Sequence, residues 1–149
     1  MFTLVVPPAY GWVVLGAGIG PFITNMYLAG AVMKGRKEYN VQYPNCYATP
    51  GYHKNADEFN RIQRSHQNFC EGLDQYIVMT VLGGLKYPIA CAVGSIFFFL
   101  GSILYQKGYS DTSLDVQTAR FKKGGAIKYI GIFISLYSTG ALAYSMLTA

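Results

Sequence analysis

The sequence predicts an all-α integral membrane protein, a bundle of four transmembrane helices. Hydrophobic residues make up 52% of its 149 residues and charged residues only 13%, which is about half the usual share of charged residues in soluble domains. Apolar runs of membrane-spanning length recur along the chain, and most basic residues lie between them. The length fits one domain, to which we assign residues 1–149.

Three of the four predicted helices are plainly apolar. The first covers residues 10–33, about 36 Å at 1.5 Å per residue, which is long enough to cross a bilayer with some tilt. Its glycines allow close helix packing, and we expect Pro21 to kink it. The third helix covers residues 87–106, with Ile-Phe-Phe-Phe-Leu at its centre, and the fourth covers residues 126–146.

The second predicted helix begins with polar residues. Strong hydropathy covers only residues 76–85, but a helix extended back to residue 57 includes Arg64, Asn68 and Glu71. At 100° per residue, these three side chains lie within about 60° of one another on one helix face. Arg61 and Gln75 extend the same stripe. Charged groups in a membrane helix are costly and usually functional, so we expect this stripe to line a polar cavity between helices.

Two interpretations of the stripe stay open on its own residues. Arg64, Asn68 and Glu71 suit a zwitterionic ligand, because a guanidinium binds carboxylates, a carboxylate accepts from an ammonium group and an amide can do both. The alternative is an internal salt bridge that allows a polar helix start to be buried.

Two further polar residues of the second helix lie outside the set formed by Arg64, Asn68 and Glu71. His66 is about 200° round the helix from Arg64, which favours a hydrogen-bonded structural histidine over a ligand or base. Asp74 has no basic neighbour in the sequence, so it either pairs with Lys86 or Lys128 or is protonated.

Several other groups of residues have ordinary structural explanations. Tyr105 and Tyr109 lie on one face of the third helix, as interfacial tyrosines of a membrane protein often do. Three cysteines and two histidines include no CxxC pair and no metal-ligand spacing, so we expect neither a disulfide framework nor a metal site.

The basic residues set the predicted orientation and exclude some functions. Eleven of the twelve Lys and Arg residues lie in or beside the loops at 34–56 and 107–125, so these loops should be cytosolic and both termini on the far side. No basic surface with interleaved stacking aromatics points to nucleic acid. A single polar helix also gives no path for a channel or transporter. Four short helices cannot enclose a large cavity, so we expect neighbouring subunits to complete it.

Three segments resemble the membrane-associated enzymes of glutathione and eicosanoid metabolism, the MAPEG superfamily. They are residues 35–44 (GRKEYNVQYP), 59–68 (FNRIQRSHQN) and 103–109 (ILYQKGY), together with the spacing of Arg64, Asn68 and Glu71. The resemblance covers nearly the whole chain. It is greatest to the type-3 microsomal glutathione transferases of that superfamily.

This resemblance implies a homotrimer with glutathione sites between adjacent subunits. The matched positions would bind glutathione as a co-substrate: Arg64, Asn68 and Glu71 on the second helix, Tyr105 and Tyr109 on the third, and Arg36 and His66, which reach the glutathione of the neighbouring subunit. In the family, an arginine at the start of the fourth helix stabilises the glutathione thiolate. Arg120 is the candidate here, with Lys122 or Lys123 as alternatives, in a third loop longer than that of relatives.

The resemblance implies a glutathione transferase and peroxidase that acts on lipophilic electrophiles, lipid hydroperoxides and an epoxide such as leukotriene A4, as a leukotriene C4 synthase does. Asp74 stands where relatives tend to have proline, and Gly72 where some have tyrosine. These departures and the altered third loop favour a rival, a catalytically lapsed protein that serves as a structural subunit of a membrane complex or presents lipid. Endoplasmic reticulum is the expected membrane, with the mitochondrial outer membrane as the alternative.

Overall fold

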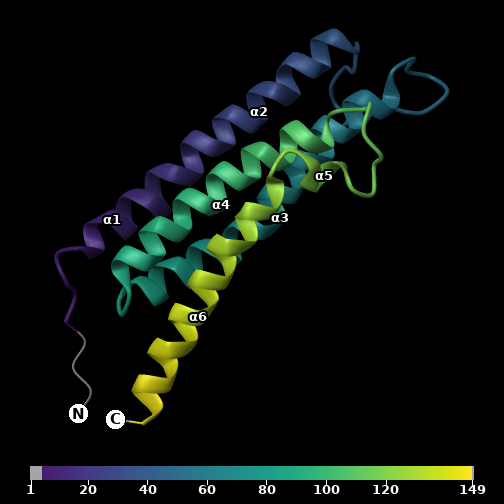
Figure 1. The fold of residues 1–149 in the computed structure, drawn as a ribbon. Coiled ribbons are helices and arrows are strands. Elements are labelled where there is room, and N and C mark those ends of the chain that lie inside the picture. Colours follow the sequence, from purple (N-terminus) through teal and green to yellow (C-terminus); the bar gives the residue numbers. More distant parts are fainter. Residues whose placement is uncertain (1–4, 149) are drawn as a thin grey trace.

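The computed structural model describes residues 5–148 and is helical throughout its regular elements in that range. Residues 1–4 and 149 of the predicted domain lie outside the described residues. Four long helical segments run side by side along one axis (Figure 1). They are the first rod, made of α1 (Tyr10–Val14), the π-helical turn η1 (Leu15–Ile19) and α2 (Gly20–Glu38), then α3 (Ala56–Gly84), α4 (Pro88–Tyr109) and α6 (Lys128–Leu147).

The first rod is longer than predicted, and its irregularity falls before the proline. It continues five residues past residue 33, since Arg36 and Lys37 in its last turn complement the helix dipole. Pro21 cannot donate to the carbonyl of residue 17. The chain departs from α geometry in the five residues Leu15–Ile19 and resumes it at Gly20. An irregular turn therefore precedes Pro21, while a kink at this proline stays a prediction.

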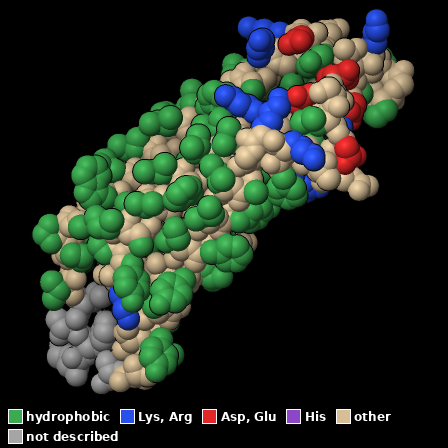
Figure 2. All heavy atoms as spheres, viewed as in Figure 1, with side chains coloured by type: hydrophobic (Ala, Val, Ile, Leu, Met, Phe, Trp, Pro, Cys, Tyr) green, Lys and Arg blue, Asp and Glu red, His purple; other side chains and the backbone are tan. Residues whose placement is uncertain are grey.

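Three segments are long and apolar enough to cross a membrane: Tyr10–Glu38, Pro88–Tyr109 and Gly125–Leu147. The fourth long helix, α3, has 29 residues, but its first half carries the charged stripe. Away from the polar end, the helices also expose large apolar side chains, such as Phe22, which is 67% exposed, and Phe133, which is 65% exposed. Apolar side chains are spread along most of the bundle's length in Figure 2, while most Lys and Arg gather at one end. The protein is therefore a membrane protein.

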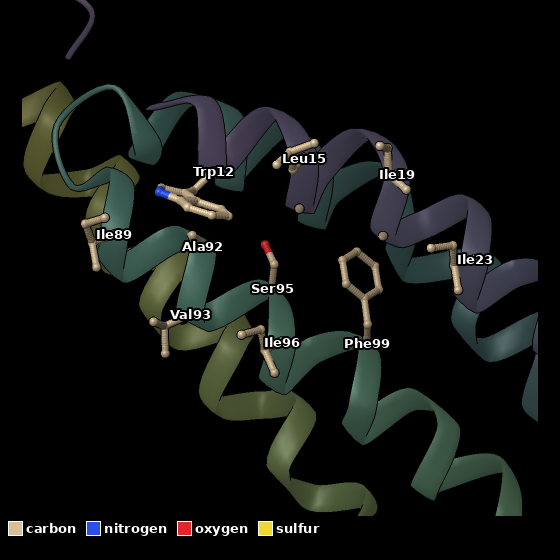
Figure 3. A pocket seen from close by; sticks show the side chains of 12 residues that line it. Trp12, Leu15, Ile19, Ile23, Ile89, Ala92, Val93, Ser95, Ile96 and Phe99 are labelled. Atoms are coloured by element: carbon tan, nitrogen blue, oxygen red, sulfur yellow. The ribbon is translucent and has the colours of Figure 1, made fainter. Parts of the chain in front are cut away.

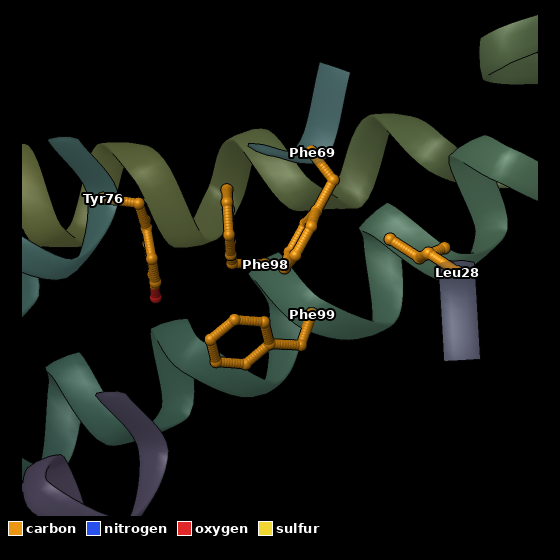
Figure 4. Packing of buried hydrophobic residues seen from close by; sticks show 5 residues of the cluster. All are labelled: Leu28, Phe69, Tyr76, Phe98 and Phe99. Atoms are coloured by element: carbon orange, nitrogen blue, oxygen red, sulfur yellow. The ribbon is translucent and has the colours of Figure 1, made fainter. Parts of the chain in front are cut away.

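The core lies where the first rod, α3 and α4 meet. Its buried cluster contains Leu28, Phe69, Tyr76, Phe98 and Phe99 (Figure 4). The rings of Tyr76 and Phe98 stack 3.7 Å apart with an interplanar angle of 6°. The Tyr76 hydroxyl donates to Ser95 Oγ at 3.4 Å, which gives this buried polar group a partner.

Close backbone contact joins α4 and α6. A Cβ atom at Gly131 of α6 would lie 2.9 Å from the backbone nitrogen of Phe98 and would collide with the carbonyl oxygen of Gly94. Glycine at this position therefore allows the two helices to approach at the distance seen here.

The two long loops lie at the same end of the bundle, opposite the start of α1 and the end of α6 (Figure 1). The second of these loops contains the short helix α5 (Ala119–Lys122) and the 3₁₀ turn η2 (Gly125–Ile127). Lys86, in the tight connection between α3 and α4, lies at the far end and donates to the carbonyl oxygen of Ala141 at 3.0 Å. This arrangement places both basic loops next to the polar start of α3.

Candidate functional site

The polar stripe of α3 holds an ion pair at the loop end of the bundle. Arg64 Nη1 donates to Glu71 Oε1 at 2.8 Å, with the two side chains 44% and 48% exposed. The two charges therefore pair, as the salt-bridge interpretation predicts, but they are not buried. An exposed ion pair of this kind contributes little to stability.

The third member of the stripe contacts a residue that the sequence analysis did not place in the site. Lys128, the first residue of α6, donates from Nζ to Asn68 Oδ1 at 2.7 Å. Its side chain is buried, and Nζ lies 4.4 Å from the centroid of the Tyr105 ring. The available signal was a lysine within the apolar run of the last helix, where a charge needs an explanation.

Asp74 was expected to pair with Lys86 or Lys128 or to be protonated, and both pairings are wrong. Lys86 lies at the opposite end of the bundle and donates to Ala141 and Ser145. Lys128 is bound to Asn68. Asp74 is instead exposed on α3, where its carboxylate accepts from the backbone N–H of Gln75 at 2.7 Å.

The two tyrosines of α4 meet the candidate arginine of the third loop. The ring centroids of Tyr105 and Tyr109 are 5.9 Å apart, and the Arg120 guanidinium carbon lies 5.9 Å from the Tyr109 ring centroid. A Cβ at Gly108 would collide with the carbonyl oxygen of Ala119, so this glycine allows α5 to approach α4. Arg120 Nε is buried and lacks a hydrogen-bond partner among residues 5–148.

The two lysines that compete with Arg120 lie elsewhere in the loop. Lys123 forms an ion pair with Asp111 at 2.7 Å, and Lys122 is exposed. The Lys123 ammonium, with the hydroxyl and the backbone N–H of Ser113, lowers the pKa of Asp111 from 3.8 to about 2. Of the three basic residues, Arg120 is therefore the one that lies against the tyrosines.

Arg61, which extends the stripe, holds the third loop to α3. Its buried guanidinium donates from Nη1 to the carbonyl oxygens of Asp111 at 2.9 Å and Leu114 at 3.2 Å. It also forms an ion pair with Asp57, one helical turn earlier, at 3.1 Å. These contacts use Arg61 for structure and fix the loop that carries Arg120.

Arg36 and His66 are not brought to the Arg64–Glu71 pair within one chain. Arg36 donates from Nη1 to the carbonyl oxygen of Asn45 at 2.7 Å, which closes its own loop. His66 Nε2 lies 2.8 Å from Asn25 Oδ1 on α2. This contact agrees with a hydrogen-bonded histidine on the opposite face of α3, and a role for either residue at a neighbouring subunit's site stays a prediction.

The first loop contributes a tyrosine that the sequence analysis did not identify. The Tyr47 hydroxyl donates to Gln67 Oε1, which places this loop residue on the polar half of α3. Burial raises the pKa of Tyr47, and the nearby Arg64 opposes this shift more weakly. The loop thus covers part of the polar end of α3 next to Arg64.

A cavity of about 310 Å³ opens between α3, α4 and α6. Asn68, Glu71 and Lys128 form its polar side, while Phe69, Met79, Phe98 and Ile132 are among its apolar lining residues. A larger groove of about 550 Å³ lies between the first rod and α4 (Figure 3). Its lining is apolar apart from Ser95, whose hydroxyl already donates to the carbonyl oxygen of Cys91 at 3.0 Å. Of these two cavities, the smaller one therefore has the polar lining.

The fold and this site define an all-helical membrane protein with charged and aromatic side chains gathered at the loop end of an apolar bundle. The model of the MAPEG family matches residues 14–141. The match covers most of the chain, and the protein belongs to the MAPEG family. The matched range includes every candidate residue from Arg36 to Lys128.

Proposed function

We propose that the protein is a glutathione-dependent membrane transferase and peroxidase that acts on lipophilic electrophiles and lipid hydroperoxides, similar to microsomal glutathione S-transferase 3. One observation carries the proposal. Glu71, which pairs with Arg64, and Asn68 line a cavity that continues between apolar side chains of α3, α4 and α6. A water-soluble zwitterion and a lipophilic substrate can both reach such a site. Members of the MAPEG family generally use glutathione, which agrees with this proposal.

The residues present fit the chemical groups of glutathione. The molecule carries two carboxylates, an ammonium group and a thiol. Arg64 would bind a carboxylate, Glu71 would accept from the ammonium group, and Asn68 would donate to a carbonyl or carboxylate oxygen. Tyr105 and Tyr109 would close the pocket from α4. The Arg120 guanidinium lies 5.9 Å from the Tyr109 ring centroid, which supports a role for it beside these tyrosines.

Glutathione supplies a thiol with a pKa of about 8.5, so only a few per cent is thiolate at neutral pH. A guanidinium next to the sulfur favours the anion, and we assign this role to Arg120. In conjugation, a bond forms between the sulfur and an electrophilic carbon as the bond to the leaving oxygen or halide breaks. In peroxidation, two glutathione molecules provide the two electrons that reduce a lipid hydroperoxide to an alcohol and water, with glutathione disulfide as the oxidised product.

The same proposal extends to the assembly and the membrane. We infer a homotrimer in which Arg36 and His66 contribute to the site of the neighbouring subunit, and the exposed apolar faces of the helices support such packing. We further infer that α3 crosses the membrane as a fourth helix, because it runs beside three helices of spanning length. Endoplasmic reticulum is the proposed membrane, with an epoxide such as leukotriene A4 among the candidate substrates.

The test is a titration of the detergent-purified protein with glutathione, followed by the ultraviolet absorbance of the thiolate. We expect thiolate to form at neutral pH, and Arg120→Ala to abolish it while glutathione still binds. Lys122→Ala is the matched control, because this exposed lysine lies two residues away in α5 and should leave thiolate formation unchanged. Equal thiolate signals from wild type and Arg120→Ala would contradict the role of Arg120.

A second function is favoured by Asp74, an exposed carboxylate on the helix that carries the site. A negative charge on this helix would disfavour a nearby thiolate, which supports a lapsed enzyme that serves as a structural subunit or presents lipid. This alternative predicts no glutathione binding at millimolar concentration and purification with other membrane proteins. Binding without thiolate formation would point to a lapsed enzyme or to a different activating base.

A further inference from the structure

A buried ammonium group faces the candidate site from α6. Lys128 is 7% exposed, and its Nζ donates one hydrogen bond, to Asn68 Oδ1 at 2.7 Å. The centroid of the Tyr105 ring lies 4.4 Å from the same nitrogen. None of the three ion pairs formed within residues 5–148 includes Lys128.

The buried ammonium group of Lys128 has no anionic partner among the described residues. Burying an ammonium group is costly unless a negative charge and hydrogen bonds compensate it, and an aromatic ring face compensates it only in part. The ammonium group has three N–H donors, and one is used among the described residues. Glu71, the carboxylate that lines the same cavity, is already paired with Arg64 at 2.8 Å.

We propose that Lys128 binds an anionic group of glutathione, either a carboxylate or the thiolate, at the polar side of the cavity between α3, α4 and α6. This inference rests on the proposed function and adds a residue to that site.

Asn68 acts with Lys128 in this anion site. Because Asn68 Oδ1 accepts from the ammonium group, the Nδ2 donors of the amide are left for another acceptor. A ligand atom next to Asn68 is therefore a hydrogen-bond acceptor. The pair combines a full positive charge from α6 with an amide donor from α3, and both suit an oxygen or sulfur anion.

The position of Lys128 is fixed by backbone packing that does not need its charge. A Cβ at Gly101 of α4 would lie 2.7 Å from Lys128 Cα, so the start of α6 rests directly on α4. Replacing a poorly paired buried charge by an apolar side chain of similar length is often neutral or stabilising. We therefore expect Lys128→Met to fold, with a melting temperature equal to or above that of the wild type.

The experiment measures the Kd of glutathione by calorimetry for the wild type, Lys128→Met, Lys128→Arg and Lys86→Met. We expect Lys128→Met to raise the Kd about 10-fold or more, and Lys128→Arg, which keeps the charge, to stay within about 3-fold of the wild type. Lys86→Met is the matched control, because this lysine lies at the opposite end of the bundle and should bind glutathione as the wild type does.

S-methylglutathione distinguishes the two anionic groups, because it keeps both carboxylates but cannot form a thiolate. If Lys128 binds the thiolate, Lys128→Met weakens glutathione binding and leaves S-methylglutathione binding unchanged. If it binds a carboxylate, both ligands weaken equally. Either pattern supports the inference.

Two results would overturn it, and they are distinguishable from each other. If the wild type binds glutathione and Lys128→Met binds it with the same Kd, Lys128 is not part of the site, and the proposed function still stands. A wild type that binds neither ligand removes both. Should Lys128→Met fail to fold, Lys128→Gln, which keeps a donor for Asn68 without the charge, replaces it with the same expected loss of affinity.

Discussion

Arg61 Nη1 donates to the carbonyl oxygen of Asp111, 50 residues further along the chain, at 2.9 Å. This hydrogen bond attaches the loop between α4 and α6 to the polar half of α3. The same loop carries Arg120, which lies against Tyr109. A residue of the polar stripe thus determines where the candidate thiolate-stabilising arginine is held.

Arg61→Met should therefore loosen the third loop. The change removes two hydrogen bonds from a buried guanidinium and leaves the carbonyl oxygens of Asp111 and Leu114 without this donor, at a cost of about 2 kcal/mol of unfolding free energy. We expect faster proteolysis at residues 110–124 and a lower melting temperature. Lys37→Met, at the exposed end of α2, is the control. Unchanged proteolysis in Arg61→Met would show that other contacts hold the loop.

The Arg64–Glu71 pair should matter for ligand binding more than for stability. Because both side chains are nearly half exposed, we expect Arg64→Met or Glu71→Gln to change the unfolding free energy by less than about 1 kcal/mol. Either change should weaken glutathione binding about 10-fold or more. Chemical denaturation and calorimetry on the same samples measure both. Large destabilisation with unchanged binding would favour the internal salt-bridge interpretation.

Two glycines of α6 should respond oppositely to alanine. At Gly131 a Cβ would lie 2.9 Å from the Phe98 nitrogen, and we expect Gly131→Ala to destabilise the protein by about 2 kcal/mol through forced separation of α4 and α6. At Gly140 a Cβ meets nothing within 4 Å, so Gly140→Ala should be neutral or stabilise by up to about 1 kcal/mol. Thermal unfolding distinguishes them, and equal melting temperatures would contradict the close packing at Gly131.

The Asp111–Lys123 contact should make the structure of the third loop sensitive to acid. The pKa of Asp111 is lowered from 3.8 to about 2 by the Lys123 ammonium and Ser113. A carboxyl group with a lowered folded pKa stabilises above its ordinary pKa, and this contribution is lost as the pH falls toward 2. We expect carboxyl NMR of the wild type to titrate near pH 2, and of Lys123→Met at a higher pH. Identical titrations would remove Lys123 as the cause.

Much of the fold could be predicted because hydropathy and helix geometry act locally. The long apolar runs predicted the first, third and fourth helices, and the helical extension of the second back through the polar residues is found in α3, which begins at Ala56. The first rod was predicted too short, since the basic residues after residue 33 looked like a loop but continue the helix. Membership of the MAPEG family was predicted and is confirmed.

The contacts of the site were less predictable, because they join residues far apart in the sequence. Periodicity placed Arg64 and Glu71 on one face of α3, where they pair. It could not show that Lys128, 60 residues beyond Asn68, would bind this amide and not Asp74. Tyr47 was also missed, because no local pattern connects a loop residue with Gln67.

The length of the first rod has a consequence for where the reactants meet. About 20 helical residues cross the hydrocarbon of a bilayer, whereas Tyr10–Glu38 has 29 residues. We infer that its last turn, which carries Arg36 and Lys37, stands in the headgroup layer. Under the proposed function, a hydrophilic tripeptide and an oily molecule would meet at the boundary between water and hydrocarbon, so neither has to enter the other's phase.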